Sequence, residues 1–226
     1  VVVPIGSTEQ HGQHLPLGTD FIVARDLARR LGERANVIVT PTIPIGYAKY
    51  HSVFPGTLSV SEETLTRALI EICEDLMKYG MTHLLFVDGH GGNVPSLSRC
   101  GTFLRNHNIP VSIACWWEMT QVVNPDWLAI GHADYVETAA ILAIDETLPD
   151  MKMAAAHPNK PLTDTIGLDN LHVARYKNGL LTVNLIMTDI TDTGDMLEFG
   201  ISSASDYTTP PTKGTAEMGE TILEGL

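Results

Sequence analysis

Short, almost wholly apolar segments alternate with amphipathic segments along most of this chain. The apolar segments are rich in β-branched or aromatic residues and are bounded by Gly, Pro or polar residues, which is typical of strands. Strands that are apolar along their whole length are covered on both faces, as in a parallel sheet. The pattern predicts an α/β layered fold with a mostly parallel sheet flanked by helices. The predicted strands are Val1–Ile5, Val37–Ile45, His83–Val87 and Val111–Trp117.

The intervening segments repeat their apolar residues every three or four positions, as amphipathic helices do. Gly32 and Gly80 follow two of these segments as stop signals, and Ser59 with Glu62 is predicted to form a capping box. Helices are therefore predicted over Phe21–Leu31 and Ser61–Tyr79, from near Asn93, from near Ala133, and over Thr215–Leu226.

The last third of the chain is less regular. Pro158–Asn170 and Asp189–Lys213 are rich in Thr, Asp, Gly and Pro, which predicts long loops around a strand at Leu180–Met187. A chain of 226 residues without internal repeats suits one sizeable α/β domain, so residues 1–226 are predicted to form a single domain.

Composition limits the partners. The formal net charge is −13, with 14 basic residues against 27 acidic ones, so we expect no nucleic acid or anionic membrane partner. The three cysteines form no CxxC pair and imply no disulfide framework. We find no signal peptide and no apolar run that would span a bilayer. These features favour a cytoplasmic protein that acts on a small molecule.

The segment that leaves the first predicted strand gathers possible metal ligands. Glu9 and His11 are two residues apart, so in an extended segment they point to the same side. Asp20 lies just before the first predicted helix, where a loop can return it to the same strand end. Glu, His and Asp together suit zinc, manganese or iron(II). Taken singly, Asp20 can be a helix cap, Glu9 a surface charge and His11 a loop residue.

A glycine-rich turn follows the third predicted strand. In open α/β sheets ligands bind beyond the carboxyl ends of the strands, which makes His90 a candidate metal ligand. The backbone N–H groups of Gly91, Gly92 and Asn93 are candidates for substrate binding, although the turn lacks the Lys-Ser/Thr ending of a phosphate loop. A histidine buried in a tight turn is the alternative for His90.

The third motif is His132-Ala-Asp-Tyr-Val-Glu137-Thr138, at the start of a predicted helix. His132 is a candidate general acid or base because a histidine pKa lies near working pH. Glu137 is a candidate metal ligand or water-orienting group, and an ordinary solvated helix start is the alternative. His51 is expected to line the pocket, and Trp117 to form a wall of it or to be buried against a helix.

Together these motifs resemble the creatininase-like (creatinine amidohydrolase) family. The family's first signature, Gly-Ser-x-Glu-Gln-His-Gly-x-His-Leu-Pro-x-x-Thr-Asp, is matched from Gly6 to Asp20, and the resemblance runs from Val1 to about residue 145. It implies a Rossmann-like α/β scaffold, often assembled as a homo-oligomer such as a hexamer. It also implies two divalent metal ions per chain (zinc, manganese or iron), with Glu9 and His90 on one ion, His11 on the other and Asp20 bridging.

One position departs from the family's type member. Creatininase itself carries a metal-binding Glu two residues after the histidine of its second motif, where this chain has Gly92. The Gly-His-Gly-Gly-Asn version resembles other branches, which include formamide deformylases, a peptidase and an inosose hydrolase. Glu137 is therefore predicted to supply the missing carboxylate.

The predicted activity is metal-dependent hydrolysis of a C–N bond in a small amide or cyclic amide. A water activated by two metal ions would attack the carbonyl, and His132 would donate a proton to the leaving nitrogen. Two alternatives stay open. One is C–C cleavage of a cyclic polyol ketone, as in the inosose hydrolase branch, and the other is a non-catalytic metal-binding scaffold.

Overall fold

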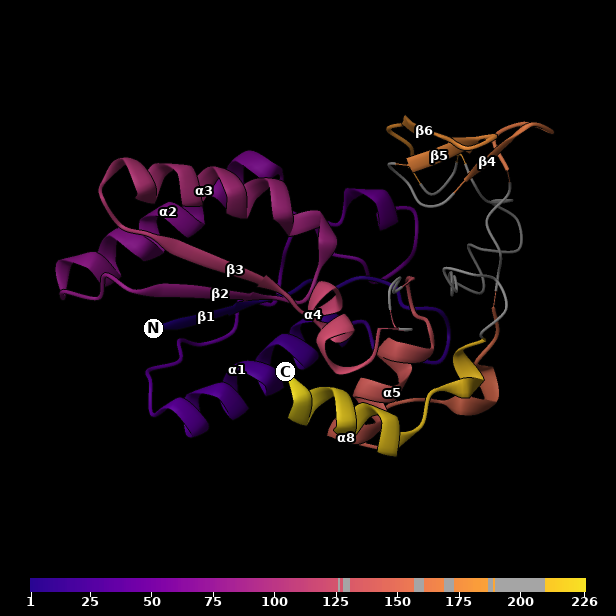
Figure 1. Cartoon of the computed structure of the whole chain (residues 1–226), viewed down its shortest axis with the longest axis horizontal. Coiled ribbons are helices and arrows are strands. Elements are labelled where there is room, and N and C mark those ends of the chain that lie inside the picture. Colours follow the sequence, from indigo (N-terminus) through magenta and orange to yellow (C-terminus); the bar gives the residue numbers. More distant parts are fainter. Residues whose placement is uncertain (126, 128–130, 157–160, 169–172, 187–188, 190–209) are drawn as a thin grey trace.

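Three parallel strands form the centre of the molecule in the computed structural model (Figure 1). The structure describes residues 1–125, 127, 131–156, 161–168, 173–186, 189 and 210–226. The strands are β1 (Val2–Ile5), β2 (Leu84–Asp88) and β3 (Val111–Cys115), in the order β1-β2-β3. Their register places Val3 beside Phe86, and Phe86 beside Ile113.

Helices cover both faces of this sheet. Successive strand residues point to opposite sides, so each face presents apolar side chains to its own layer of helices. Val3 and Phe86 pack on one side against α2 (Glu62–Lys78) and α3 (Val94–Asn106). Val2 and Val87 pack on the other side against a second group of helices. That group consists of α1 (Thr19–Ala35), α5 (Tyr135–Ile144) and α8 (Ala216–Gly225). The predicted α/β layered fold is confirmed.

Two predicted strands differ from the structure. The segment Val37–Ile45 runs beside β1 but makes only isolated parallel bridges, at Val39 and Ile43. Pro41 and Pro44 have no N–H to donate, which prevents a continuous ladder there. The strand predicted to reach Trp117 ends at Cys115, and an unpredicted helix, α4 (Trp116–Val123), begins at once.

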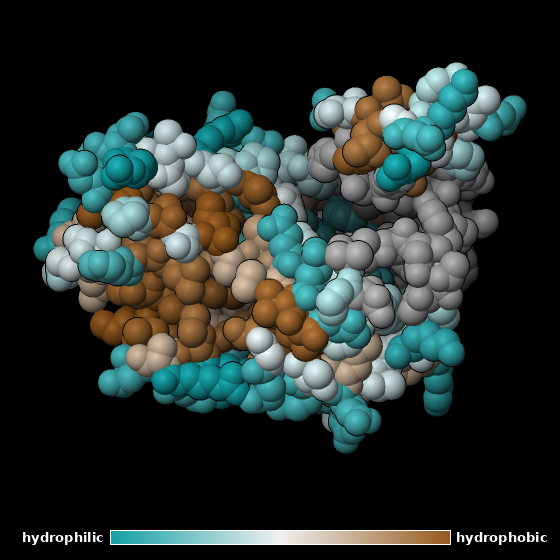
Figure 2. Space-filling model, viewed as in Figure 1, coloured by the Kyte–Doolittle hydropathy of each residue, from teal (hydrophilic) through white to brown (hydrophobic). Residues whose placement is uncertain are grey.

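Edge strand β3 is less covered than β1. All four residues of β1 are buried, whereas Val111, Ile113 and Ala114 of β3 are only partly buried. Figure 2 shows apolar side chains gathered over the region where β2 and β3 run in Figure 1.

Most predicted helices are present, with two changes in detail. α1 continues past Gly32 and ends at Ala35, where Asn36 takes a left-handed conformation (φ 52°). A Cβ on Gly32 would lie 2.5 Å from the Val39 side chain, so this glycine permits close packing instead of ending the helix. Ser61 caps α2, since its side chain accepts a hydrogen bond from the Thr64 N–H. The Ser59 hydroxyl, predicted to form the cap, accepts a hydrogen bond from the Ala48 N–H instead. The helices expected near Asn93, near Ala133 and at the C-terminus are confirmed as α3, α5 and α8.

A second, antiparallel sheet lies in the last third of the chain. It contains β4 (Ile166–Leu168), β5 (Val173–Tyr176) and β6 (Gly179–Thr182). The strand predicted over Leu180–Met187 therefore ends at Thr182, and Met187 lies outside the described residues. Residues 166–168 form a strand where a loop was predicted. The parts of the predicted loops at 158–160, 169–170 and 190–209 lie outside the described residues.

Short 3₁₀ turns complete the chain path, at η1 (Lys49–His51), η2 (Gly91–Asn93), η3 (Met151–Met153) and η4 (Pro211–Lys213). Within the described ranges, none of the helices has the length and apolarity needed to cross a bilayer. The assignment of residues 1–226 to one domain stays a prediction.

Candidate metal centre

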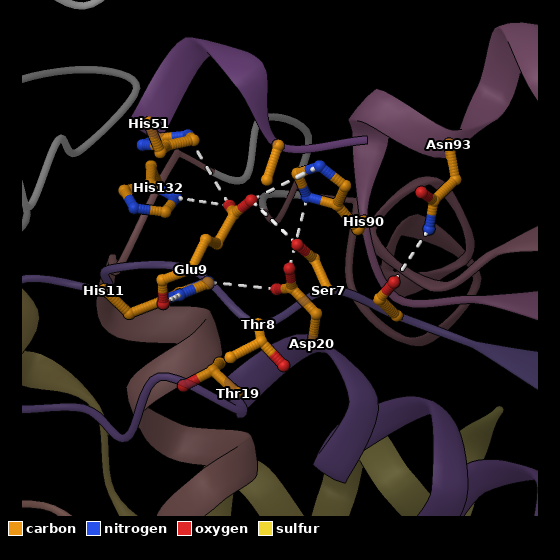
Figure 3. Close-up of polar contacts among 12 residues, drawn as sticks. Ser7, Thr8, Glu9, His11, Thr19, Asp20, His51, His90, Asn93 and His132 are labelled. Carbon is orange, nitrogen blue, oxygen red and sulfur yellow. Dashed lines mark hydrogen bonds and ion pairs between the residues drawn. The ribbon is translucent and has the colours of Figure 1, made fainter. Parts of the chain in front are cut away.

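The carboxyl ends of β1 and β2 meet the first turn of α1 at a cluster of buried acidic and imidazole side chains (Figure 3). Two glycines make this approach possible. A Cβ on Gly6 would lie 2.3 Å from the Phe21 nitrogen, and one on Gly89 would lie 2.2 Å from the Asp20 carbonyl oxygen. With no side chains at these positions, the start of α1 presses against both strand ends and brings Asp20 into the cluster.

Asp20 lies between two histidines. It is the second residue of α1, and the helix has no side-chain cap, so its carboxylate is not used for capping. Its Oδ1 lies 2.9 Å from His11 Nε2, and its Oδ2 lies 3.1 Å from His90 Nδ1. Both His11 Nε2 and Asp20 Oδ2 are buried without a hydrogen-bond partner. Each oxygen of this carboxylate thus faces a different imidazole, as a bridging metal ligand would.

Potential ligand atoms form three overlapping groups, of which Glu9, His51 and His132 make one, and the other two lie on either side of Asp20. The first set is Glu9, Asp20 and His90, and the second set is His11, His132 and Glu137; within each, the ligand atoms lie within 4.8 Å of one another. Glu137 Oε2 lies 3.7 Å from His11 Nε2, so the second set reaches Asp20 through His11. Mixed imidazole and carboxylate donors suit zinc, manganese or iron(II), and the residues present therefore fit divalent metal ions. The structure brings all five predicted metal ligands together.

Neighbouring groups orient the ligands. The carbonyl oxygen of Glu9 lies 3.1 Å from His11 Nδ1, so Nδ1 carries the proton and Nε2 faces Asp20. The Ser7 hydroxyl donates to Glu9 Oε2 at 3.1 Å, and the Ala133 N–H donates to Glu137 Oε2 at 2.6 Å. Hydrogen bonds of this kind fix the orientation of metal ligands in proteins.

The electrostatics of the cluster favour positive charge. Burial raises the pKa of Glu9, but His51 and His90 outweigh it and hold that pKa well below its usual value. Burial lowers the pKa of His11, but Asp20 and Glu137 outweigh it and raise that pKa to about 10. Burial also raises the pKa of Glu137, to about 8. Without metal, Glu9 is therefore ionised at neutral pH, whereas His11 and Glu137 hold protons where cations would otherwise bind.

A pair of stacked imidazoles lies beside the cluster. The rings of His51 and His132 have centroids 4.2 Å apart and an interplanar angle of 27°. His51 Nε2 and His132 Nδ1 lie 3.5 and 3.7 Å from the same oxygen, Oε1 of Glu9. Burial lowers the pKa of His51, and burial with the neighbouring His51 and His11 lowers the pKa of His132 well below its usual value. Both rings are therefore neutral near pH 7.

Gln10 holds this pair, and sequence reasoning missed it. The Gly12 N–H donates to Gln10 Oε1 at 3.0 Å, so the amide nitrogen faces the histidines, 3.0 Å from His51 Nδ1. The backbone oxygen of Gln10 accepts a hydrogen bond from His132 Nε2. Gln10 stands between two predicted ligands in the first motif, and that position was the only signal in the sequence.

Of the predicted substrate-binding residues, some lie in or beside the cluster and others are used in contacts within the protein. His51 lies in the cluster, and Gly91 lies beside the Trp117 ring, with its Cβ position 3.9 Å from Trp117 Cζ2. Asn93, in contrast, is fully buried and its carboxamide is engaged by the protein. A Cβ on Gly92 would lie 2.1 Å from the Tyr47 carbonyl oxygen, so Gly92 permits a close backbone approach. Substrate binding by these residues stays a prediction.

The fold and this cluster of potential ligands define an α/β protein with a candidate metal site, and comparison with known proteins identifies the family. Residues 1–226 match the family model for creatinine amidohydrolase (Creatininase). The chain belongs to the creatininase family.

Curated relatives carry several activities. A mycofactocin precursor peptide peptidase from Mycolicibacterium smegmatis is 35% identical over 158 residues, which is 66% of this chain and 60% of the relative. A creatinine amidohydrolase from Pseudomonas putida is 27% identical over 179 residues, which is 70% of this chain and 69% of the relative. The chain spans 45% to 66% of the length of the mycofactocin precursor peptide peptidases that it matches.

Solved structures support the fold. A manganese form of creatininase superposes with a TM-score of 0.70 at 23% identity, covering 99% of this chain and 85% of that one. A Zn-Zn form of a creatininase variant superposes equally well, with a TM-score of 0.70 at 23% identity and coverage of 99% and 84%.

Proposed function

We propose that this chain hydrolyses a C–N bond of an amide substrate with the help of two divalent metal ions. The observation that carries the proposal is the position of Asp20, whose two carboxylate oxygens face His11 and His90 from two different ligand sets. Such a shared carboxylate is what a dinuclear centre requires. When bound, two divalent ions polarise a carbonyl and lower the pKa of water toward neutrality.

The chain's own residues divide this work. Glu9, His90 and Asp20 would hold one ion, and His11, Glu137 and Asp20 the other. A side chain at Gly92 would collide with the Tyr47 carbonyl and with His90 Nε2, so no carboxylate can come from that position. Glu137 has the remaining carboxylate within reach of His11, which supports its assignment to the second ion.

His132 would carry the proton. Its pKa is lowered well below the usual value, chiefly by burial, so it is neutral near pH 7 and must take up a proton before it can donate one. Its Nε2 donates to Gln10 O, which leaves Nδ1, the nitrogen facing Glu9, as the proton acceptor. As water adds to the carbonyl carbon, its proton passes to Nδ1. The same proton then moves to the amide nitrogen as the C–N bond breaks.

A turnover screen tests the proposal. The protein loaded with zinc or manganese would be assayed against short peptides, creatinine, formamides and a cyclic polyol ketone. These compounds represent the proposed amide chemistry and the names of relatives, one of which is a 3-dehydro-scyllo-inosose hydrolase. We expect cleavage of an amide. Turnover of the ketone alone would favour C–C cleavage, and stoichiometric metal without any turnover would favour a metal-binding scaffold.

A further inference from the structure

Asn93 joins three segments of the chain behind His90 (Figure 3). It is fully buried between η2 and α3. Its Nδ2 donates to the Gly6 carbonyl at the end of β1 and to Asp88 Oδ1 at the end of β2, both at 3.1 Å. Its Oδ1 accepts the Tyr47 N–H at 3.1 Å. These backbone partners determine which atom of the carboxamide is oxygen and which is nitrogen, because a carbonyl only accepts and an N–H only donates.

The peptide that Asn93 holds in turn contacts His90. The Tyr47 carbonyl oxygen lies 2.8 Å from His90 Nε2. Since a carbonyl cannot donate, Nε2 must carry the proton in this contact. In a neutral ring the lone pair is then on Nδ1, which lies 3.1 Å from Asp20 Oδ2. The chain from Asn93 through Tyr47 to His90 thus determines which imidazole nitrogen faces Asp20.

Two glycines show independently that this contact is built into the packing. A Cβ on Gly46 would lie 2.2 Å from Asn93 Oδ1, and a Cβ on Gly92 would lie 2.1 Å from the Tyr47 oxygen. Real Cβ atoms do not approach so closely, so segments 46–47 and 92–93 meet only because both positions lack a side chain.

We infer that Asn93 is a positioning residue that, through the Tyr47 carbonyl, directs His90 to bind its metal ion by Nδ1. The inference rests on the metal centre of the proposed function. It differs from the earlier expectation that Asn93 binds substrate, because both polar ends of its carboxamide are used within the protein. Hydrogen bonds to the second nitrogen of a ligating histidine fix its tautomer and its ring orientation.

The competing geometry uses the other nitrogen. His90 Nε2 also lies 3.3 Å from Glu9 Oε2, and an ion shared by these two atoms would need the lone pair on Nε2. That lone pair would face the Tyr47 carbonyl at 2.8 Å, which is repulsive. The carbonyl contact is the shorter one and is held by Asn93, so we favour Nδ1.

The parent protein gives the first test. The zinc-loaded protein, labelled with ¹⁵N-histidine, would be analysed by long-range ¹H–¹⁵N correlation, which separates a protonated nitrogen from a metal-bound one. We expect His90 to show a protonated Nε2 and a zinc-bound Nδ1. Zinc bound through Nε2 would overturn the inference while leaving the metal centre intact. Failure to bind zinc at all would overturn both.

Two variants test the role of Asn93 itself. Asn93→Ala and Gly46→Ala disturb the same contact from opposite sides, and Asn106→Ala, an exposed position on α3, is the matched control. We expect both substitutions to lower the affinity for one of the two zinc ions by about 10- to 100-fold in chelator competition, the usual effect of removing such a partner. The His90 Nε2–H signal should be lost. Unchanged affinity for the second zinc ion should show that the site is still folded. Retention of that signal and of both zinc affinities in either folded variant would overturn the inference.

Discussion

The two ligand sets around Asp20 are built in different ways. The first set, Glu9, Asp20 and His90, comes from the ends of β1 and β2 and the first turn of α1, where glycines allow close backbone packing. The second set, His11, His132 and Glu137, joins the first motif loop to the start of α5, more than a hundred residues later in the chain. All three residues of the first set are buried, whereas His132 is partly exposed.

This difference indicates which half of the site is free to vary within the fold. The first set depends on glycines at the strand ends where its residues meet. In the second set, Glu137 lies in the first turn of α5, 3.7 Å from His11, and its carboxylate accepts a hydrogen bond from the Ala133 N–H. The second set also includes His132, the proposed proton carrier, whose ring stacks on His51. We therefore expect the first set to determine metal retention and the second set to determine reactivity.

The largest expected effect comes from Asp20, the residue of the first set that also faces the second. Asp20→Ala should release both ions and abolish metal-dependent turnover, because each oxygen of Asp20 faces one set. Metal analysis by mass spectrometry checks this, with exposed Glu33→Ala on the same helix as control. Two ions still bound to a folded Asp20→Ala protein would reject the bridging assignment.

Much of the first set was predictable from sequence, for a physical reason. Apolar strands, glycines and chelating residues at strand ends are local signals, so the sequence alone predicts Glu9, Asp20 and His90 as potential ligands. The supporting contacts were not predictable. The Tyr47 carbonyl is a backbone atom. Gln10 contacts His51 and His132, 41 and 122 residues away in sequence, and Asn93 contacts Tyr47 and Gly6, 46 and 87 residues away.

The errors in the fold have similar causes. An apolar pattern at Val37–Ile45 predicts a strand, but two prolines interrupt its ladder. The sheet containing β4, β5 and β6 was only partly predicted: the predicted strand Leu180–Met187 overlaps β6, whereas β4 and β5, of 3 and 4 residues, are too short to show a clear pattern. Short antiparallel strands of this kind depend on cross-strand pairing more than on local sequence.

The second largest effect should fall on turnover alone. His132→Ala should keep its fold and retain metal, since Asp20 and Glu137 remain, but lose on the order of 10²–10⁴ in kcat, the usual contribution of a positioned acid–base group. The loss should be smaller for substrates with better leaving groups, which need less protonation. Melting temperature, metal content and kcat measured on one preparation check this. Unchanged activity per folded molecule would end the catalytic assignment of His132.

Glu137→Gln separates the two sets. The amide is close in shape to the carboxylate but is a weaker metal ligand, so we expect about one ion per chain, with the first set still occupied. Exposed Glu146→Gln, just after α5, is the control and should bind as the parent does. Metal titration against a chelator distinguishes the outcomes. Two ions bound with parental affinity would remove Glu137 from the ligands.

The smallest expected effect is a dependence of metal affinity on pH, to which both sets contribute. Burial lowers the pKa of His90, but Glu9 and Asp20 outweigh it and raise that pKa well above its usual value. With pKa values of about 10 for His11 and about 8 for Glu137, both groups are protonated at pH 7 in the metal-free protein. An ion can bind only as these protons leave, so loading should release protons and affinity should rise with pH. Each displaced proton raises the metal affinity about tenfold per pH unit below the pKa of its group, so the rise in affinity should become less steep above about pH 8, once Glu137 is ionised.

Calorimetric titration with zinc in buffers of different ionisation enthalpy counts the released protons. Glu137→Gln should release fewer and bind with a shallower pH dependence than the parent. Equal proton release by parent and variant would show that Glu137 does not lose a proton when metal binds.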